Sequence, residues 1–170
     1  MKTNTVYLIV AVLVVVIVVG VAGYMLLNNG ENNNGTTPTP TPGPNVAEAT
    51  SLQFNANITS QGQTTEYMWY GANLNSANEK LRVDFVTYVY ILDAGQQKSW
   101  MSMDSGATWT EGTFADDWNS WGTQWTEYVS SLAMWNGTDD ISYANAAEEA
   151  IVLSNIVINP TIPDSTFATS

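Results

Sequence analysis

The chain has 170 residues, with 16 acidic side chains against 4 basic ones, a formal net charge of -12, and neither cysteine nor histidine. Disulfides, thiolate zinc sites, a cysteine nucleophile and any catalytic relay or metal site that requires imidazole are therefore excluded. The charge argues against a nucleic-acid partner, because phosphate binding needs Lys and Arg to replace counterions. We expect no enzyme, no cofactor and no metal, and one modest domain with an appendage.

Residues 1–27 have the pattern of a transmembrane anchor. No residue from Val6 to Leu27 is charged, and about 22 residues reach roughly 33 Å as a helix, which is enough to span a bilayer. Lys2 precedes this stretch and Glu31 follows it, so the positive-inside rule predicts a cytoplasmic N-terminus and an extracellular remainder in the cell membrane. A cleaved signal peptide is the alternative, although its apolar region usually has only about 7–15 residues.

Residues 28–45 are rich first in Asn and Gly and then in Thr and Pro. The Thr/Pro part, 36–44, predicts a polyproline II spacer of roughly 28 Å at about 3.1 Å per residue. We expect this segment to be a stalk that holds the following domain away from the membrane.

Residues 46–170 have a globular composition and contain all 7 tryptophans, and about 125 residues can bury one core. Apolar and polar residues alternate over 50–59, which predicts a half-buried strand with its asparagines on the solvent side. Further strands are expected over 64–72, over 80–92 as two strands or one long bent strand, over 97–103 and 107–110 as a hairpin, and over 140–144 and 150–159.

One long helix is predicted over 114–135. Thr113 followed by Asp116 is typical of a capping box, and Asn136-Gly137 is typical of a helix C-terminus. The large apolar side chains fall in a stripe of roughly 120° on a helix of 100° per residue. This stripe comprises Phe114, Trp118, Trp121, Trp125, Tyr128, Val129, Leu132 and Trp135. The domain is therefore expected to be α+β, with an antiparallel sheet and one long amphipathic helix.

The aromatic stripe has two interpretations. Helical spacing of large apolar groups usually indicates core. However, three tryptophans within two turns, at about 150–250 Å² each, bury more area than one helix face on a small sheet normally requires. Part of a ligand cavity is therefore the second interpretation, with Trp118, Trp121, Trp125 and Tyr128 as the candidate ligand-binding residues.

Residues 102–109, Ser-Met-Asp-Ser-Gly-Ala-Thr-Trp, resemble the Asp-box hairpin, S-x-D-x-G-x-T-W. Its Asp carboxylate is expected to accept backbone N–H bonds across the turn, its Gly to adopt a φ that a Cβ would forbid, and its Trp to cover the loop. We interpret Ser102, Asp104, Gly106 and Trp109 as a structural hairpin, since one copy cannot form a propeller.

Two kinds of surface feature are also predicted. Asn34, Asn57 and Asn136 each begin an Asn-x-Thr sequence and are candidate glycosylation sites in the stalk, on the first strand and at the helix end. The acidic pairs lack the alternating ligand spacing of a calcium loop, and a glycosidase pair is defined only by separation in space. We expect these pairs, at 116–117, 139–140 and 148–149, to be solvated surface.

Several segments together resemble one known family. The most specific is Asn-Pro-Thr-Ile-Pro-Asp-Ser-Thr-Phe at 159–167, and looser matches occur at 52–56, 81–84, 90–92 and 98–100. The domain is similar to the LolA/LppX-type lipoprotein-carrier superfamily, especially its small membrane-anchored archaeal relatives. This resemblance implies a strongly curved antiparallel sheet, a half-open barrel, with a helix across its mouth and an apolar cavity for acyl chains. No site residue is transferred from the family, because the lipoprotein-contacting arginine of bacterial carriers has no matched position.

The leading hypothesis is a membrane-anchored extracytoplasmic module that binds a lipid or a lipidated protein. The alternative is a structural or adhesive cell-surface glycoprotein without a ligand cavity. A cavity above about 300 Å³ lined by Trp118, Trp121 or Trp125 would favour the first, and a solid interior the second.

Overall fold

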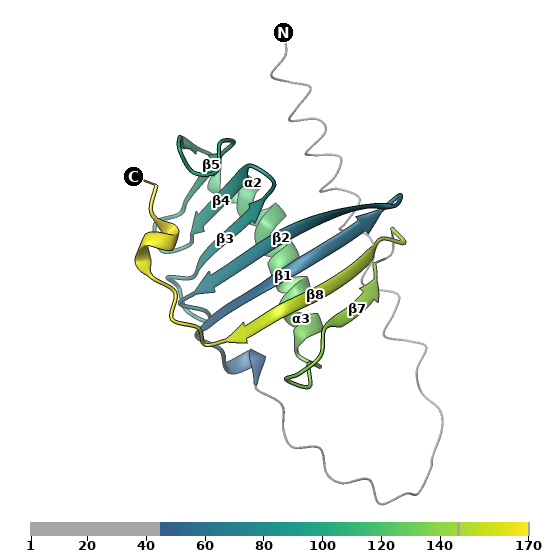
Figure 1. The fold of residues 1–170 in the computed structure, drawn as a ribbon. Helices are drawn as coiled ribbons and strands as arrows, with labels where there is room; N and C mark the ends of the chain where they lie inside the picture. The colour runs from purple at the N-terminus through teal and green to yellow at the C-terminus, as the bar shows by residue number, and fades with distance from the viewer. Residues whose placement is uncertain (1–44, 146, 170) are drawn as a thin grey trace, which may run out of the picture.

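The computed structural model describes residues 45–145 and 147–169. Within them, the strands form one open antiparallel sheet of 8 strands in the order β6-β5-β4-β3-β2-β1-β8-β7, with a helix between β6 and β7 (Figure 1). The expected α+β class is thus confirmed. The strands are β1 Ser51–Ser60, β2 Gln63–Ala72, β3 Lys80–Phe85, β4 Tyr88–Asp93, β5 Lys98–Ser102, β6 Thr110–Glu111, β7 Ile141–Ala144 and β8 Ala150–Ile158.

The expected membrane anchor, most of the stalk and Asn34 lie outside the described residues. In the described part of the chain, no helix has the length and apolar character needed to cross a bilayer.

Tight turns connect the central strands of the sheet. Gln61 and Gly62, with φ of 51° and 79°, join β1 to β2. The predicted strand region 80–92 contains two strands, because Val86 and Thr87 turn the chain between β3 and β4. Val86 adopts a φ of 54° and is 84% exposed, a conformation that is unfavourable for a β-branched residue.

One face of the sheet forms the core. The strand register aligns Phe54, Trp69, Val83 and Tyr90 across β1 to β4, and all four side chains are buried. On this face, the predicted alternation of buried and exposed side chains in β1 is correct. On the other face it is wrong for Asn55, which is also buried. Its side-chain amide donates a hydrogen bond of 2.6 Å to the Glu66 carboxylate, which compensates its burial.

The helix crosses the core face of the sheet diagonally (Figure 1). It consists of α2 Phe114–Asp117, a π-helical turn η3 Trp118–Gly122 and α3 Thr123–Leu132. It begins where the sequence predicts but ends three positions before the expected Trp135, whose indole N–H donates to the Asp139 carbonyl at 2.7 Å. The predicted capping box is wrong in detail, because the Thr113 side chain makes no cap hydrogen bond.

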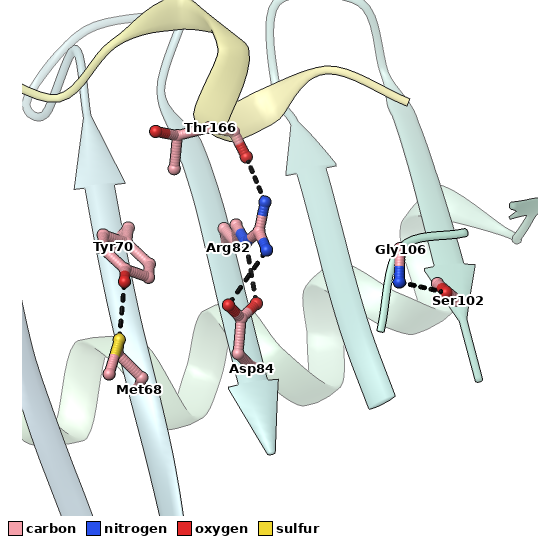
Figure 2. Close-up of polar contacts among 7 residues, drawn as sticks. All are labelled: Met68, Tyr70, Arg82, Asp84, Ser102, Gly106 and Thr166. Atoms are coloured by element: carbon pink, nitrogen blue, oxygen red, sulfur yellow. Dashed lines mark hydrogen bonds and ion pairs between the residues drawn. The ribbon is translucent and has the colours of Figure 1, made fainter. Parts of the chain in front are cut away.

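The C-terminal segment lies over the opposite face of the sheet (Figures 1 and 2). After β8 the chain forms a short 3-10 helix, η4 Asp164–Phe167, which contacts β3. Arg82 Nη1 donates to the Thr166 carbonyl at 2.7 Å, while its Nε and Nη2 donate to the two oxygens of Asp84 at 2.7 and 3.0 Å. The helix and the C-terminal segment therefore cover different faces. At the N-terminal end of the domain, η2 Val46–Glu48 contacts α3.

Candidate functional site

Three of the four candidate ligand-binding residues lie between helix and sheet. Trp121, Trp125 and Tyr128 are 5%, 5% and 1% exposed. They pack on Trp69 of β2 with ring centroids 5.7–5.9 Å away, and Phe54 of β1 contacts Trp69, Trp125 and Tyr128. We call Phe54, Trp69, Trp121, Trp125 and Tyr128 the aromatic cluster. Its direct ring contacts make it part of the hydrophobic core.

Polar atoms also lie within the helix–sheet interface. Gln124, on the helix face expected to be solvated, is buried and donates a 2.8 Å hydrogen bond to the Tyr128 hydroxyl. Burial raises the pKa of Tyr128, so this phenol stays protonated. Trp69 Nε1 is the one buried side-chain N or O atom in the described residues without a hydrogen-bond partner. A donor left in this state destabilises a fold by about 1–3 kcal/mol.

Trp118 is separated from the aromatic cluster by the π-helical turn. A π turn contains one more residue than an α turn, so the residues before it rotate by roughly 100° relative to those after it. Phe114 and Trp118 are consequently only half-buried; they pack against the margin of the core and contact one another at a centroid distance of 5.3 Å. Trp118 therefore lies at the margin of the core that contains the other three candidates, rather than within the aromatic cluster.

One flank of the helix carries an open groove of about 370 Å³, which we call the Trp125 groove. The helix, η2 and the β2–β3 connection each contribute to its walls. Its apolar lining comprises Val46, Ala47, Leu74, Trp125, Val129 and Ala133. Gly71 of β2 allows the Trp125 indole to approach the sheet, since a Cβ there would lie 2.5 Å from Trp125 Cζ2. The indole is thus fixed with one edge in the core and another at the groove.

Glu79 is the charged residue of this groove. It precedes β3 and shares the strand face of buried Leu81, so it points toward the helix. Burial raises the pKa of Glu79, and a hydrogen bond from the Trp125 side chain partly opposes that shift. The other polar lining residues are Asn75, Thr126 and Ser130, and the groove therefore combines apolar walls with one half-buried carboxylate.

A second, shallower groove of about 380 Å³, which we call the Trp118 groove, lies nearer the N-terminal end of the same helix. Trp118 and Phe114 form its apolar part, and Gln97, Asn119 and Thr123 are polar lining residues. Trp118 packs close to Gly122, where a Cβ would lie 3.1 Å from the indole Cε2 and Nε1. The two grooves share Thr126, so they adjoin along the helix, and each is lined by one tryptophan.

The Asp-box-like hairpin lies between β5 and β6 and contributes no residue to the lining of either groove. Asp104 accepts hydrogen bonds from the Thr108 N–H at 2.8 Å, the Thr108 hydroxyl at 2.6 Å and the Ser102 hydroxyl at 2.7 Å. These bonds lower the pKa of Asp104 to about 2. Gly106 has a φ of 93° and donates to Ser102 Oγ at 2.8 Å (Figure 2). A Cβ on Gly106 would lie 3.5 Å from the Trp109 ring, so the motif forms a closed turn.

The two described glycosylation candidates differ in their surroundings. Asn57 is half-buried on β1, opposite Glu66 and Val152 in the sheet. Asn136 is exposed, but its Nδ2 donates to Asp139 Oδ2 at 2.8 Å and its Oδ1 accepts from the Thr138 N–H at 3.0 Å. A glycan on Asn136 would replace one of the two Nδ2 hydrogens, so the bond to Asp139 would have to use the other.

The acidic pairs lie at separate places in the described structure. Among residues 45–145 and 147–169, no group of three or more His, Cys, Asp or Glu side chains could hold a metal ion. Asp117 accepts a 2.5 Å hydrogen bond from the Ser99 hydroxyl, and Glu149, expected on the surface, is 7% exposed and accepts from Asn145 Nδ2 at 2.9 Å. The expectation of full solvation is thus wrong for Glu149, whose carboxylate is compensated locally.

Comparison of the chain with protein-family models, with curated proteins and with solved structures gives no match.

Sequence reasoning missed Glu79 and Leu74 as groove residues. Leu74 belongs to a connection that the sequence predicts only as a polar loop, and Glu79 precedes a strand whose alternation begins at Leu81. Extending the period-2 pattern of β3 back by one step would have placed Glu79 on the core face.

Proposed function

We propose that this chain is a membrane-anchored extracytoplasmic module that binds an apolar ligand, a lipid or the acyl chain of a lipidated protein, in the Trp125 groove. The observation that carries this proposal is the groove itself. Its volume of about 370 Å³ lies within the roughly 300–1,000 Å³ typical of small-ligand sites, and its apolar walls with few polar groups match their usual composition.

The architecture of the proposed carrier follows the LolA/LppX resemblance. In this proposal the antiparallel sheet is a curved, half-open barrel, and the helix that bears Trp121, Trp125 and Tyr128 is the lid across it. Movement of this helix away from the sheet would join the Trp125 groove to the aromatic cluster. The unpartnered Trp69 N–H would then become available to a ligand oxygen, which supports this route to a larger site.

The proposed location depends on residues 1–45. An uncleaved anchor over 1–27 would place the domain outside the cell membrane, and the stalk over 28–45 would tether it there. Val46 lies both at the end of this stalk and in the wall of the Trp125 groove. The tether would therefore keep the groove close to a ligand that leaves the bilayer, which raises its effective concentration.

A second function, a structural or adhesive surface glycoprotein, is supported by a different observation. Rings of the aromatic cluster are in direct contact, with centroids as close as 5.4 Å between Phe54 and Trp125. Such packing is typical of a solid core. In this case the grooves would be ordinary surface hollows, and glycans on Asn57 and Asn136 would contribute to solubility.

Native mass spectrometry of the full chain, purified from the membranes in which it is made, distinguishes these functions. We expect co-purifying lipid on the wild type and its loss in Ala133→Trp, because an indole at this exposed groove position would occupy the apolar space. Ala115→Trp, a matched change in the Trp118 groove, should retain the lipid. Absence of lipid from the wild type, or equal retention by both variants, would contradict binding in the Trp125 groove.

A further inference from the structure

The described basic residues are all engaged away from the Trp125 groove. Lys80 pairs with Asp93 at 3.3 Å, Arg82 with Asp84 at 2.7 Å and Lys98 with Glu111 at 3.4 Å. The fourth basic residue of the chain is Lys2, outside the described part. Described cations are thus already matched to acids other than Glu79.

Sequence neighbours of Glu79 cannot neutralise it. Successive strand residues point to opposite faces, and Lys80, directly after Glu79, pairs with Asp93 on the face of the sheet opposite the helix. The described contact of the Glu79 carboxylate is the hydrogen bond from the Trp125 side chain. A half-buried carboxylate therefore lines the groove without a cation.

An unpaired carboxylate in an apolar wall determines which ligand fits best. Burial disfavours the charged form of Glu79, and an opposite charge placed nearby would stabilise it. An anionic ligand would instead be repelled both by Glu79 and by a chain with a net charge of -12.

We propose that the Trp125 groove selects amphiphiles in which an apolar tail is joined to an ammonium group, and that Glu79 forms the ion pair with this group. The tail lies along Leu74, Val129 and Ala133, and the ammonium lies against the Glu79 carboxylate. This inference rests on the proposed function, since it names the ligand class of the same groove.

The test compares hexyltrimethylammonium with hexyl glucoside, a neutral probe with the same tail, by isothermal titration calorimetry. The full chain is held in lipid nanodiscs, and empty nanodiscs provide the blank for partitioning into lipid. Glu79→Gln keeps the shape and a hydrogen-bond acceptor but removes the charge. Glu48→Gln, an exposed position in η2, removes the same charge outside the groove lining.

We expect Glu79→Gln to weaken hexyltrimethylammonium binding about fivefold, as for a partly exposed ion pair near 1 kcal/mol. Its affinity for hexyl glucoside should change less than twofold, which also verifies that the variant is folded. Glu48→Gln should leave both affinities within twofold. Equal effects of the two substitutions on hexyltrimethylammonium binding, or no effect of Glu79→Gln, would overturn the ammonium site. If hexyl glucoside binding is retained in that case, the proposed function still stands. If the wild type binds neither hexyltrimethylammonium nor hexyl glucoside, the ammonium site and the proposed function are both overturned.

Discussion

At the scale of single residues, the best-defined polar group is the Asp104 carboxylate. Three hydrogen bonds, two from Thr108 and one from Ser102, hold its pKa near 2 although the side chain is exposed. Hydrogen bonds to the charged form, rather than burial, produce this shift. Ser105 and Gly106 both have positive φ in the same turn, so the carboxylate and the backbone conformation support one another.

Asp104 should make folding stability depend on pH. Because its folded pKa of about 2 lies below the ordinary value of 3.8, its ionised form contributes stability that is present above about pH 4 and is lost as the pH falls toward 2. We expect Asp104→Asn to destabilise the domain at neutral pH and this difference from the wild type to shrink over that window, measured by urea unfolding.

Asp140→Asn provides the control, because it removes the same charge at an exposed position outside the turn. A difference between wild type and Asp104→Asn that is constant from pH 5 to about 2 would contradict the assigned role of the carboxylate.

At the scale of elements, the helix–sheet contact depends on the absence of a side chain at Gly71. An added Cβ would lie 2.5 Å from Trp125 Cζ2 and 2.6 Å from its Cη2, and Trp125 is held by Phe54 and Trp69. Because these neighbours are themselves buried, the indole could move only toward the Trp125 groove, and such a shift would separate it from its packing partners.

We therefore expect Gly71→Ala to destabilise the domain by about 1–3 kcal/mol, the usual effect of overpacking a core. Gly95→Ala is the milder comparison, because its Cβ would meet Asn78 Oδ1 at 2.6 Å, an exposed side chain that can rotate away, and its next contacts, Asn78 Cα and Asp93 Oδ1, would lie at 3.3 Å. Thermal unfolding of both variants is the measurement. Equal stability of Gly71→Ala and the wild type would show that the helix is not packed tightly at Trp125.

The strands and the helix were predictable because their periods depend on local residue order. Alternation over 50–59 gives β1, and the polar connection after it gives the first turn. Val86 carries no turn signal, so whether 80–92 was one strand or two could not be decided. The π turn at Trp118–Gly122 likewise has no characteristic residue type, and its effect on Trp118 requires the packed helix.

The candidate site was only partly predictable for the same reason. Trp125 follows from the helical stripe, but the groove beside it exists because Val46, Leu74 and Ala133, far apart in sequence, lie around one hollow. Asn55 and Glu149 were expected at the surface because they are polar. Their burial depends on partners, Glu66 and Asn145, which a single strand pattern does not identify.

At the scale of the whole molecule, the two faces of the sheet have different coverings. The helix packs on one face and carries two adjoining grooves, and the C-terminal segment is fixed to the other face by Arg82 and Thr166 (Figures 1 and 2). Tryptophans are distributed between these regions. Trp125 reaches one groove, Trp118 the other, and Trp100 shares a face with Ile91 and Arg82, away from the helix.

This distribution makes the indole N–H signals reporters for the central claim, that an apolar ligand binds in the Trp125 groove. The most direct measurement is a ¹⁵N–¹H NMR titration of the full chain in nanodiscs with hexyl glucoside. The account predicts a saturable shift of the Trp125 indole signal, with the Trp100 signal unchanged. Saturable shifts at Trp100 or Trp118 without one at Trp125, or no saturable shift at all, would contradict it.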